Sequence, residues 1–259
     1  AARLESAGCD APRLDAELLL AEVMGTDRAG LVVDARSELA PPQAAAFEAL
    51  VARREGREPV AYILGRKGFR HLELAVDPRV LIPRPDTEVL VEVGLALPRG
   101  TRVVEIGTGS GAVALSLKHE RPDLHVTATE VDAGALEVAR ANAARLGLDV
   151  EFRQADLLEG AGGPFEALLA NIPYVAPGDY ARLAPEIADH EPRLAVVAEE
   201  EGFALLRRLA SQLNGTPFVA LEVGLAQEDV VAELLAAAGY ATETRRDLSG
   251  IERVVIGRR

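Results

Sequence analysis

A four-residue element, Asn171-Ile172-Pro173-Tyr174, ends the apolar stretch 165–171 and carries groups that can hold a nitrogen atom. Asn171 offers a side-chain carbonyl acceptor, and Pro173 keeps Ile172 extended so that its backbone carbonyl is a second acceptor. Two acceptors can bind both hydrogens of a planar NH2 group, and Tyr174 can stack on that plane. An amide or aryl amine nitrogen is a poor nucleophile, because its lone pair is delocalised. Holding both hydrogens aims the nitrogen and eases its rehybridisation. The alternative is a strand that simply ends in an Asn-x-Pro turn.

A glycine-rich segment, EIGTGSGA at 105–112, follows one expected strand and precedes an expected helix. Gly107 and Gly109 permit a tight turn and a close backbone approach to a ligand, with helix amides just beyond. The spacing is G-x-G-x-G rather than the dinucleotide pattern, which favours a nucleoside cofactor without a pyrophosphate. Glu105 can face the positively charged amino-acid part of such a ligand. We therefore predict cofactor contacts from Glu105, Gly107, Thr108, Gly109, Ser110 and Gly111.

Acidic residues follow the next two expected strands. Glu130 ends the second strand and can accept hydrogen bonds from both ribose hydroxyls, and Asp156 follows the third strand, where it can bind an adenine amine. Because ligands of open α/β sheets bind at the carboxyl ends of the strands, these acids should lie on one site. Together with Leu157 and Asn171, they predict a pocket for S-adenosylmethionine. The alternative is that they are ordinary loop acids and helix caps.

The elements that position these residues alternate between strand and helix, which predicts right-handed βαβ units and a Rossmann-like, mostly parallel α/β sheet. Expected strands lie at 102–107, 124–131, 149–154, 165–171 and 218–224. Expected helices lie at 112–119, 133–146 and 227–238. The segments 240–247 and 251–257 should form an antiparallel C-terminal hairpin around Ser249-Gly250.

The chain before this sheet has a different character. Residues 1–57 carry helix signals only and predict a small helical bundle for substrate docking or as a lid, with a mere stability cap as the alternative. Residues 58–88 are expected to be a linker with a β-hairpin: one strand around 69–76, a turn at 77–79 and a returning strand at 80–82. Residues 89–259 then form the cofactor-binding domain.

Bulk composition narrows the class of protein. The net charge of −13 argues against sequence-independent binding of DNA or RNA and permits a protein or small-molecule substrate. The sequence has no apolar run long enough to span a membrane and no signal peptide, so we expect a cytoplasmic protein without membrane contact. The single cysteine, Cys9, excludes an intrachain disulfide, and the four histidines, His71, His119, His125 and His190, lack metal-ligand spacing. We predict no metal and a monomer.

Several segments together resemble the HemK/PrmC family: the glycine-rich turn, the Asn-x-Pro-Tyr element, LIPRPDTE (81–88), RLDAELLL (13–20) and DLSGIERVV (247–255). The resemblance covers nearly the whole chain. It implies a class I methyltransferase that uses S-adenosylmethionine to methylate the glutamine side-chain amide in the Gly-Gly-Gln loop of peptide-chain release factors. It also implies that residues 107–111, Glu130 and Asn171 contact the cofactor, and that residues 171–174 hold the substrate amide.

One residue departs from the family pattern. The family element is Asn-Pro-Pro-Tyr, and Ile172 replaces its first proline. The backbone carbonyl survives this change, but the stiffness of the ring is lost. A paralogue acting on another protein amide, an enzyme acting on an exocyclic amine of a nucleic-acid base and a non-catalytic binding module remain alternatives. Arg84, between two prolines, can reach the cofactor carboxylate or the substrate, or form a structural salt bridge.

Overall fold

The computed structural model describes residues 1–33, 38–213 and 215–259. Two compact units divide the chain: residues 1–66 together with 184–190, and residues 67–183 together with 191–259. The predicted helical domain at 1–57 includes residues 34–37, which lie outside the described residues. The predicted domain limits at 57 and 88 stay predictions.

The first unit is helical and carries its own core. Its helices are α1 Ala2–Ser6, α2 Pro12–Met24, α3 Arg28–Val33, α4 Pro41–Glu55, α5 Val60–Leu64 and α9 Pro185–Ala188. Proline at the first position favours the starts of α2 and α4, and Gly25 ends α2 in the left-handed region at φ 65°. Leu4, Leu19, Val51 and Ile63 are buried together.

A buried ion cluster joins distant parts of this unit. The Arg54 guanidinium lies 2.8 Å from the Asp15 carboxylate and 2.8 Å from the Glu186 carboxylate. Arg57 also pairs with Glu186, at 2.6 Å. Because removing one partner would leave a buried charge uncompensated, this cluster holds the 184–190 segment to the helices around α4.

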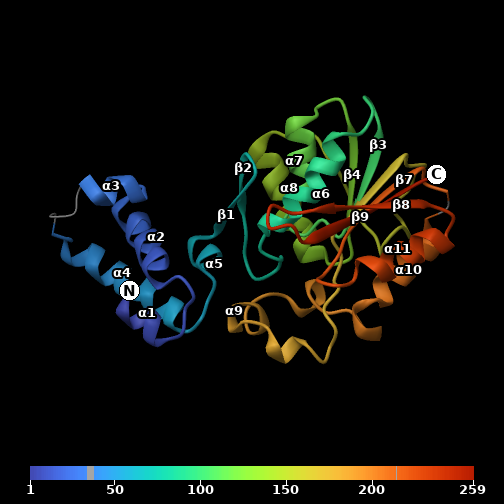
Figure 1. Cartoon of the computed structure of the whole chain (residues 1–259). Helices are drawn as coiled ribbons and strands as arrows, with labels where there is room; N and C mark the ends of the chain where they lie inside the picture. Colours follow the sequence, from blue (N-terminus) through green and yellow to red (C-terminus); the bar gives the residue numbers. More distant parts are fainter. Residues whose placement is uncertain (34–37, 214) are drawn as a thin grey trace. The chain divides into compact units, whose positions relative to one another are not determined.

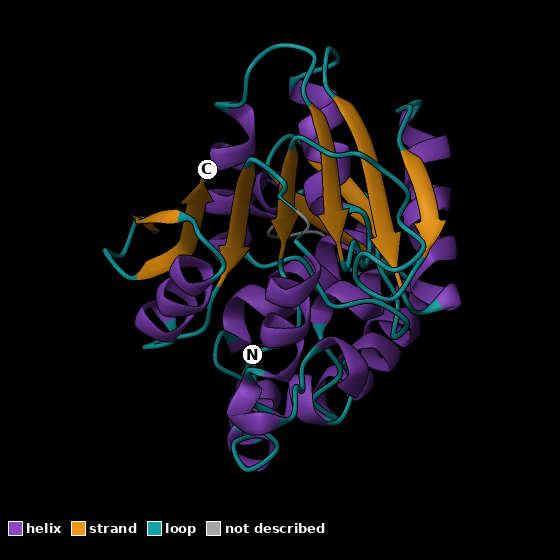
Figure 2. Cartoon of the chain, turned by 90° about the vertical axis from the view of Figure 1, so that its right-hand side faces the viewer, coloured by secondary structure: helices purple, strands orange, loops and turns teal. Residues whose placement is uncertain are grey.

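The second unit contains a seven-stranded sheet in the order β5-β4-β3-β6-β7-β9-β8 (Figures 1 and 2). The strands are β3 Arg102–Ile106, β4 His125–Glu130, β5 Glu151–Gln154, β6 Ala167–Ala170, β7 Phe218–Glu222, β8 Ala241–Arg246 and β9 Glu252–Arg258. The first five in this series are parallel, and β9 is antiparallel to both β7 and β8. The predicted parallel sheet with an antiparallel C-terminal hairpin is confirmed.

Helices cover both faces of the sheet, which explains its nearly continuous apolar strands. On one face α6 Glu88–Leu95, α7 Ala112–Glu120 and α8 Ala133–Leu146 pack over a core that includes Val103. On the other face α10 Ala204–Gln212 and α11 Glu228–Ala237 pack over a core that includes Val104 (Figure 1). Short 3-10 helices are η1 Pro85–Thr87, η2 Tyr180–Arg182, η3 Arg193–Ala195 and η4 Glu200–Gly202.

The hairpin that precedes this sheet differs from the prediction. Strand β1 Arg66–Phe69 pairs with β2 Leu72–Ala75, and the chain turns at Arg70, whose φ is 48°. The predicted returning strand at 80–82 is wrong. Val80 and Ile82 bury their side chains, but their amides donate to the Asp77 carbonyl at 3.0 Å and the Glu191 carboxylate at 3.2 Å. This segment therefore makes loop contacts instead of a strand ladder.

Candidate active site

A cavity of about 490 Å³ opens at the carboxyl ends of β3, β4, β5 and β6, within the sheet unit. This volume is in the usual range for a small-molecule site. The predicted site residues in its wall are Gly107, Gly109, Glu130, Asp156, Leu157, Asn171, Ile172 and Pro173. The cavity thus brings together the glycine-rich turn, the acids and the Asn-x-Pro element. The wall does not include Glu105, Thr108, Ser110, Gly111 or Tyr174.

The glycine-rich turn is held tightly against β4. The amides of Gly107 and Thr108 both donate to the Thr129 carbonyl, each at 2.9 Å. Gly107 has a φ of 72°, and Gly111, at φ 87°, precedes the first residue of α7. A Cβ atom on Gly111 would lie only 2.8 Å from the Leu115 side chain, so this position has no room for a larger residue.

Glu105 supports the turn from within. Its Oε2 accepts hydrogen bonds from the Thr108 hydroxyl at 2.6 Å and from the Ala114 amide at 3.1 Å. Burial raises the pKa of Glu105 to about 7, and these hydrogen bonds oppose the rise. The carboxylate contacts the turn and the first residues of α7, and the predicted contact with the cofactor's ammonium group stays a prediction.

Glu130 lies at the end of β4 and takes part in the cavity wall. Its Oε2 accepts from the Gly109 amide at 2.9 Å, and its Oε1 accepts from the amides of Val131 at 2.9 Å and Asp132 at 3.2 Å. Burial raises the pKa of Glu130 above its ordinary value. These bonds fix the carboxylate beside the turn, and the two oxygens have about four acceptor positions in total, so capacity for a ligand hydroxyl remains.

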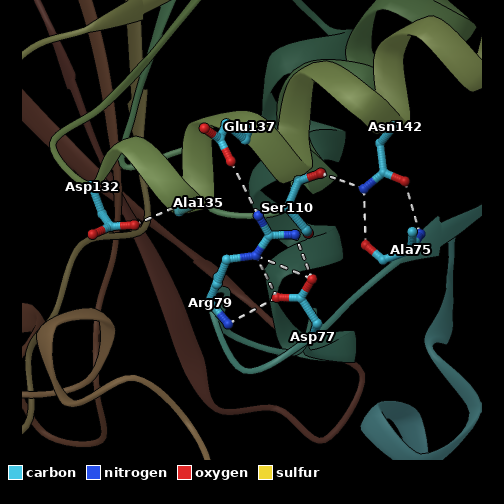
Figure 3. Close-up of polar contacts among 8 residues, drawn as sticks. All are labelled: Ala75, Asp77, Arg79, Ser110, Asp132, Ala135, Glu137 and Asn142. Carbon is cyan, nitrogen blue, oxygen red and sulfur yellow. Dashed lines mark hydrogen bonds and ion pairs between the residues drawn. The ribbon is translucent and has the colours of Figure 1, made fainter.

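Asn142, on α8, ties the turn to strand β2, and Figure 3 shows this contact. Its Oδ1 accepts from the Ala75 amide at 2.8 Å, while its Nδ2 donates to the carbonyls of Ala75 at 2.9 Å and Ser110 at 3.0 Å. The sequence interpretation missed this residue. The sequence could have revealed Asn142, because this amide side chain lies three and four positions after Ala139 and Val138, on the face of the helix that is buried.

Arg79 is another wall residue that the interpretation did not single out. Its guanidinium pairs with Asp77 at 2.7 Å and with Glu137 on α8 at 3.2 Å (Figure 3). Asp132 caps the same helix by accepting from the Ala135 amide at 2.8 Å. The start of α8 is therefore fixed at the cavity rim by a cap and an ion pair.

Arg84 forms a salt bridge with the buried carboxylate of Glu191. Glu191 also accepts from the Ile82 amide at 3.2 Å. Of the alternatives left open for Arg84, the structure shows the structural pair, which anchors the loop before η1.

The Asn-x-Pro-Tyr element follows β6, directly beside the glycine-rich turn. Asn171 Nδ2 donates to the Thr87 hydroxyl oxygen at 3.0 Å. Ile172 is buried, and its Cγ2 lies 3.4 Å from the position of a Cβ atom on Gly107. The Tyr174 carbonyl accepts from Gln227 at 3.0 Å, and burial raises the pKa of its phenol to about 12. Asn171 and Ile172 thus lie in the wall, and the Tyr174 ring packs against Gly224.

Two features are absent from the described ranges 1–33, 38–213 and 215–259. No helix there is long and apolar enough to cross a membrane. No group of three or more His, Cys, Asp and Glu side chains there is arranged to hold a metal ion.

Comparison with known proteins gives consistent matches. Residues 1–65 match the PrmC N-terminal domain and residues 85–199 match the methyltransferase small domain. A release factor glutamine methyltransferase of Rhodospirillum rubrum is 40% identical over 266 residues, covering 99% of this chain and 82% of that protein. One of Koribacter versatilis is 40% identical over 265 residues, covering 99% and 94%. The crystal structure of a methyltransferase from Pyrococcus furiosus shares the fold, with a TM-score of 0.57, 20% identity and coverage of 82% and 96%.

Proposed function

The chain belongs to the release factor glutamine methyltransferase family, and we propose that it methylates the side-chain amide nitrogen of the glutamine in the Gly-Gly-Gln motif of peptide-chain release factors, with S-adenosylmethionine as donor. The observation that carries this proposal is the position of Asn171 and Ile172. They line the same cavity as the glycine-rich turn and Glu130.

The cavity residues fit this cofactor. Gly107 and Gly109 leave the wall open to a close backbone approach, and Glu130 presents a fixed carboxylate at the end of β4. We propose that Glu130 accepts a hydrogen bond from a ribose hydroxyl at its remaining acceptor position, and that Asp156 and Leu157 surround the adenine. When bound, S-adenosylmethionine supplies an electrophilic methyl group. Glu105 holds the shape of the turn, and we assign any contact of Glu105, Thr108, Ser110 and Gly111 with the cofactor to their backbone or to this support.

The acceptor element positions the glutamine amide. Its Asn171 Oδ1 accepts one amide hydrogen, and the Ile172 carbonyl accepts the other, so that the nitrogen lone pair is aimed at the methyl group. Pro173 keeps the preceding residue extended. Tyr174 packs against Gly224, where a Cβ atom would lie 2.9 Å from its ring, and so supports the wall. We propose that the Tyr174 ring also stacks on the plane of the substrate amide.

Ile172 is compatible with this mechanism although it replaces the family proline. The backbone carbonyl is retained, and the side chain fills space beside Gly107, where it is buried. We propose that this packing replaces part of the rigidity that a proline ring would supply.

We further propose that the enzyme acts as a cytoplasmic monomer and that the helical unit docks the release factor. The charge of −13 disfavours a nucleic-acid substrate, because phosphate binding requires a basic surface. The paralogue and nucleic-acid alternatives differ from this proposal in which molecule receives the methyl group.

A labelling experiment separates these substrates. The enzyme is incubated with methyl-labelled S-adenosylmethionine and, in parallel, with a purified bacterial release factor, with total RNA or with DNA. We expect label in the release factor alone. Label in RNA or DNA, or in a different protein when a cell extract is offered, would reject the proposed substrate.

A further inference from the structure

Glu222, the last residue of β7, is a buried carboxylate that the sequence interpretation did not identify. It is 3% exposed, and its Oε2 has no hydrogen-bond partner among the described residues. The structure gives it no ion pair within the described ranges. The cation whose charge acts on it, Arg253, is shared between Asp86 at 2.9 Å and Asp247 at 2.9 Å. A buried charge without a direct partner is costly, so an apolar residue here would favour stability.

Its position is set by the sheet. Strands β6 and β7 are parallel neighbours, with Ala170 opposite Leu221, so the next residues, Asn171 and Glu222, follow side by side. Thr87, at the end of η1, completes the group: it is 5% exposed, and its hydroxyl oxygen accepts from Asn171 Nδ2 at 3.0 Å. Three segments that are far apart in the sequence therefore converge behind the acceptor wall.

The electrostatics agree with this geometry. Burial raises the pKa of Glu222 to about 7, and hydrogen bonding from Thr87 and from Asn171 opposes that rise. Among the residues that the structure describes, no hydrogen bond reaches Asn171 Oδ1, whereas Nδ2 donates to the Thr87 hydroxyl oxygen at 3.0 Å and faces the side where Glu222 ends β7.

We propose that Glu222, acting with Thr87, is a positioning residue that holds the NH2 group of Asn171 and so turns Asn171 Oδ1 toward the substrate amide. This inference rests on the proposed function of Asn171 as an acceptor. An amide side chain can bind in two flipped orientations, and only one presents oxygen to the substrate. A carboxylate and a hydroxyl oxygen behind the NH2 group select that orientation. Glu222 itself is not in the cavity wall, so it acts through Asn171.

The first test is Glu222→Gln, which keeps the shape but can donate as well as accept, so it no longer selects one orientation. We expect kcat for release factor methylation to fall by about 10- to 100-fold, by analogy with the range seen for hydrogen-bond partners that orient metal-ligating side chains. KM for the release factor and the affinity for S-adenosylmethionine should each change by less than about 3-fold. Glu243→Gln, on the exposed strand β8, is the matched control and should retain the full rate. A full rate for Glu222→Gln would overturn the proposal.

Substitutions of Thr87 give a second, independent test of the positioning role. Thr87→Val removes the hydroxyl with nearly the same shape and should lower kcat, whereas Thr87→Ser retains the acceptor and should restore most of the rate. Equal loss in both variants would point to packing alone and contradict the positioning role.

A double-mutant cycle then distinguishes positioning from a general structural effect. If Glu222 acts through Asn171, Glu222→Gln should have little further effect on kcat in an Asn171→Ala background. Multiplying effects would overturn the inference, even when both single variants are slow. Absence of methyl transfer by the unchanged enzyme would instead reject the proposed function, so the two failures are distinguishable.

Discussion

At the level of single residues, the proposed mechanism depends on which atoms of Asn171 are already engaged. Its Nδ2 donates to Thr87 at 3.0 Å, which leaves Oδ1 as the atom available to an amide hydrogen. Ile172 contributes a backbone carbonyl, so its side chain can vary without loss of the acceptor. The two residues should therefore respond very differently to substitution.

We predict that Asn171→Ala lowers the single-turnover rate of methylation by roughly 100- to 1,000-fold, because it removes an interaction made mainly in the transition state. Affinity for S-adenosylmethionine should fall much less, since the glycine-rich turn and Glu130 remain. Ile172→Pro is the matched variant and should be tolerated or faster, because it keeps the carbonyl and restores a rigid ring. Near-normal turnover by Asn171→Ala would refute the acceptor role.

Glu105 gives a prediction about pH. Its pKa is raised by burial from 4.5 to about 7, so the folded state binds this proton more tightly than the unfolded state. The group therefore destabilises the fold progressively as the pH rises from about 4.5 to 7, by on the order of 3 kcal/mol. Glu105→Gln removes this titration. In denaturant titrations, its stability relative to the unchanged protein should be greater at pH 8 than at pH 5. An identical difference at both pH values would show that burial does not shift this carboxyl.

The site residues differ in how well the sequence alone predicts their position in the site. Glu130 and Asn171 follow strands that the apolar pattern identifies, so their place at one edge of the sheet could be predicted. Glu222 and Thr87 could not be assigned in the same way, because their role depends on β6 lying beside β7 and on η1 approaching both.

At the scale of elements, the glycine-rich turn is held from three sides. The Thr129 carbonyl accepts from the amides of Gly107 and Thr108. The Glu105 carboxylate accepts from the Thr108 hydroxyl and from the Ala114 amide of α7. The Asn142 side chain, on α8, binds Ala75 of β2 and the Ser110 carbonyl. This framework explains how a turn rich in glycine keeps a defined shape before a ligand arrives.

We predict that Asn142→Ala lowers both the stability of the protein and its affinity for S-adenosylmethionine. It leaves the amide and carbonyl of Ala75 and the carbonyl of Ser110 without their partner, so unfolding free energy should fall by about 2–4 kcal/mol. Affinity for S-adenosylmethionine should fall as well, because the turn loosens. Arg140→Ala, at an exposed position of the same helix, should change stability by less than about 0.5 kcal/mol. Denaturant titration and calorimetry measure both effects, and equal stability of the two variants would contradict the anchoring role.

The elements themselves were predictable where periodicity was strong. The alternation of strands and helices after residue 100 gave the parallel sheet, and Ser249-Gly250 gave the final turn. The helix α10 was not anticipated, although Leu206, Leu209 and Leu213 recur at helical spacing and are buried. The early hairpin turns at Arg70 instead of at 77–79, because the buried residues at 80–82 are held by loop contacts.

At the scale of the whole molecule, the sequence could not reveal that residues 184–190 belong with the helical unit. Glu186 joins Arg54 and Arg57 across more than 120 positions of the chain, and pairing over such a separation has no local signature. The same segment directly follows the region that bears the acceptor element. The chain thus leaves the sheet unit after residue 183 and re-enters it at residue 191, and residues 184–190 belong to the helical unit.

The most direct test of this account locates the transferred methyl group. A bacterial release factor is methylated with the purified enzyme, and its peptides are sequenced by mass spectrometry, alongside a release factor whose Gly-Gly-Gln glutamine is replaced by asparagine. The account predicts a single added methyl on the side-chain nitrogen of that glutamine and no methyl on the substituted protein. A methyl on any other residue, or an equally methylated substituted protein, would contradict it.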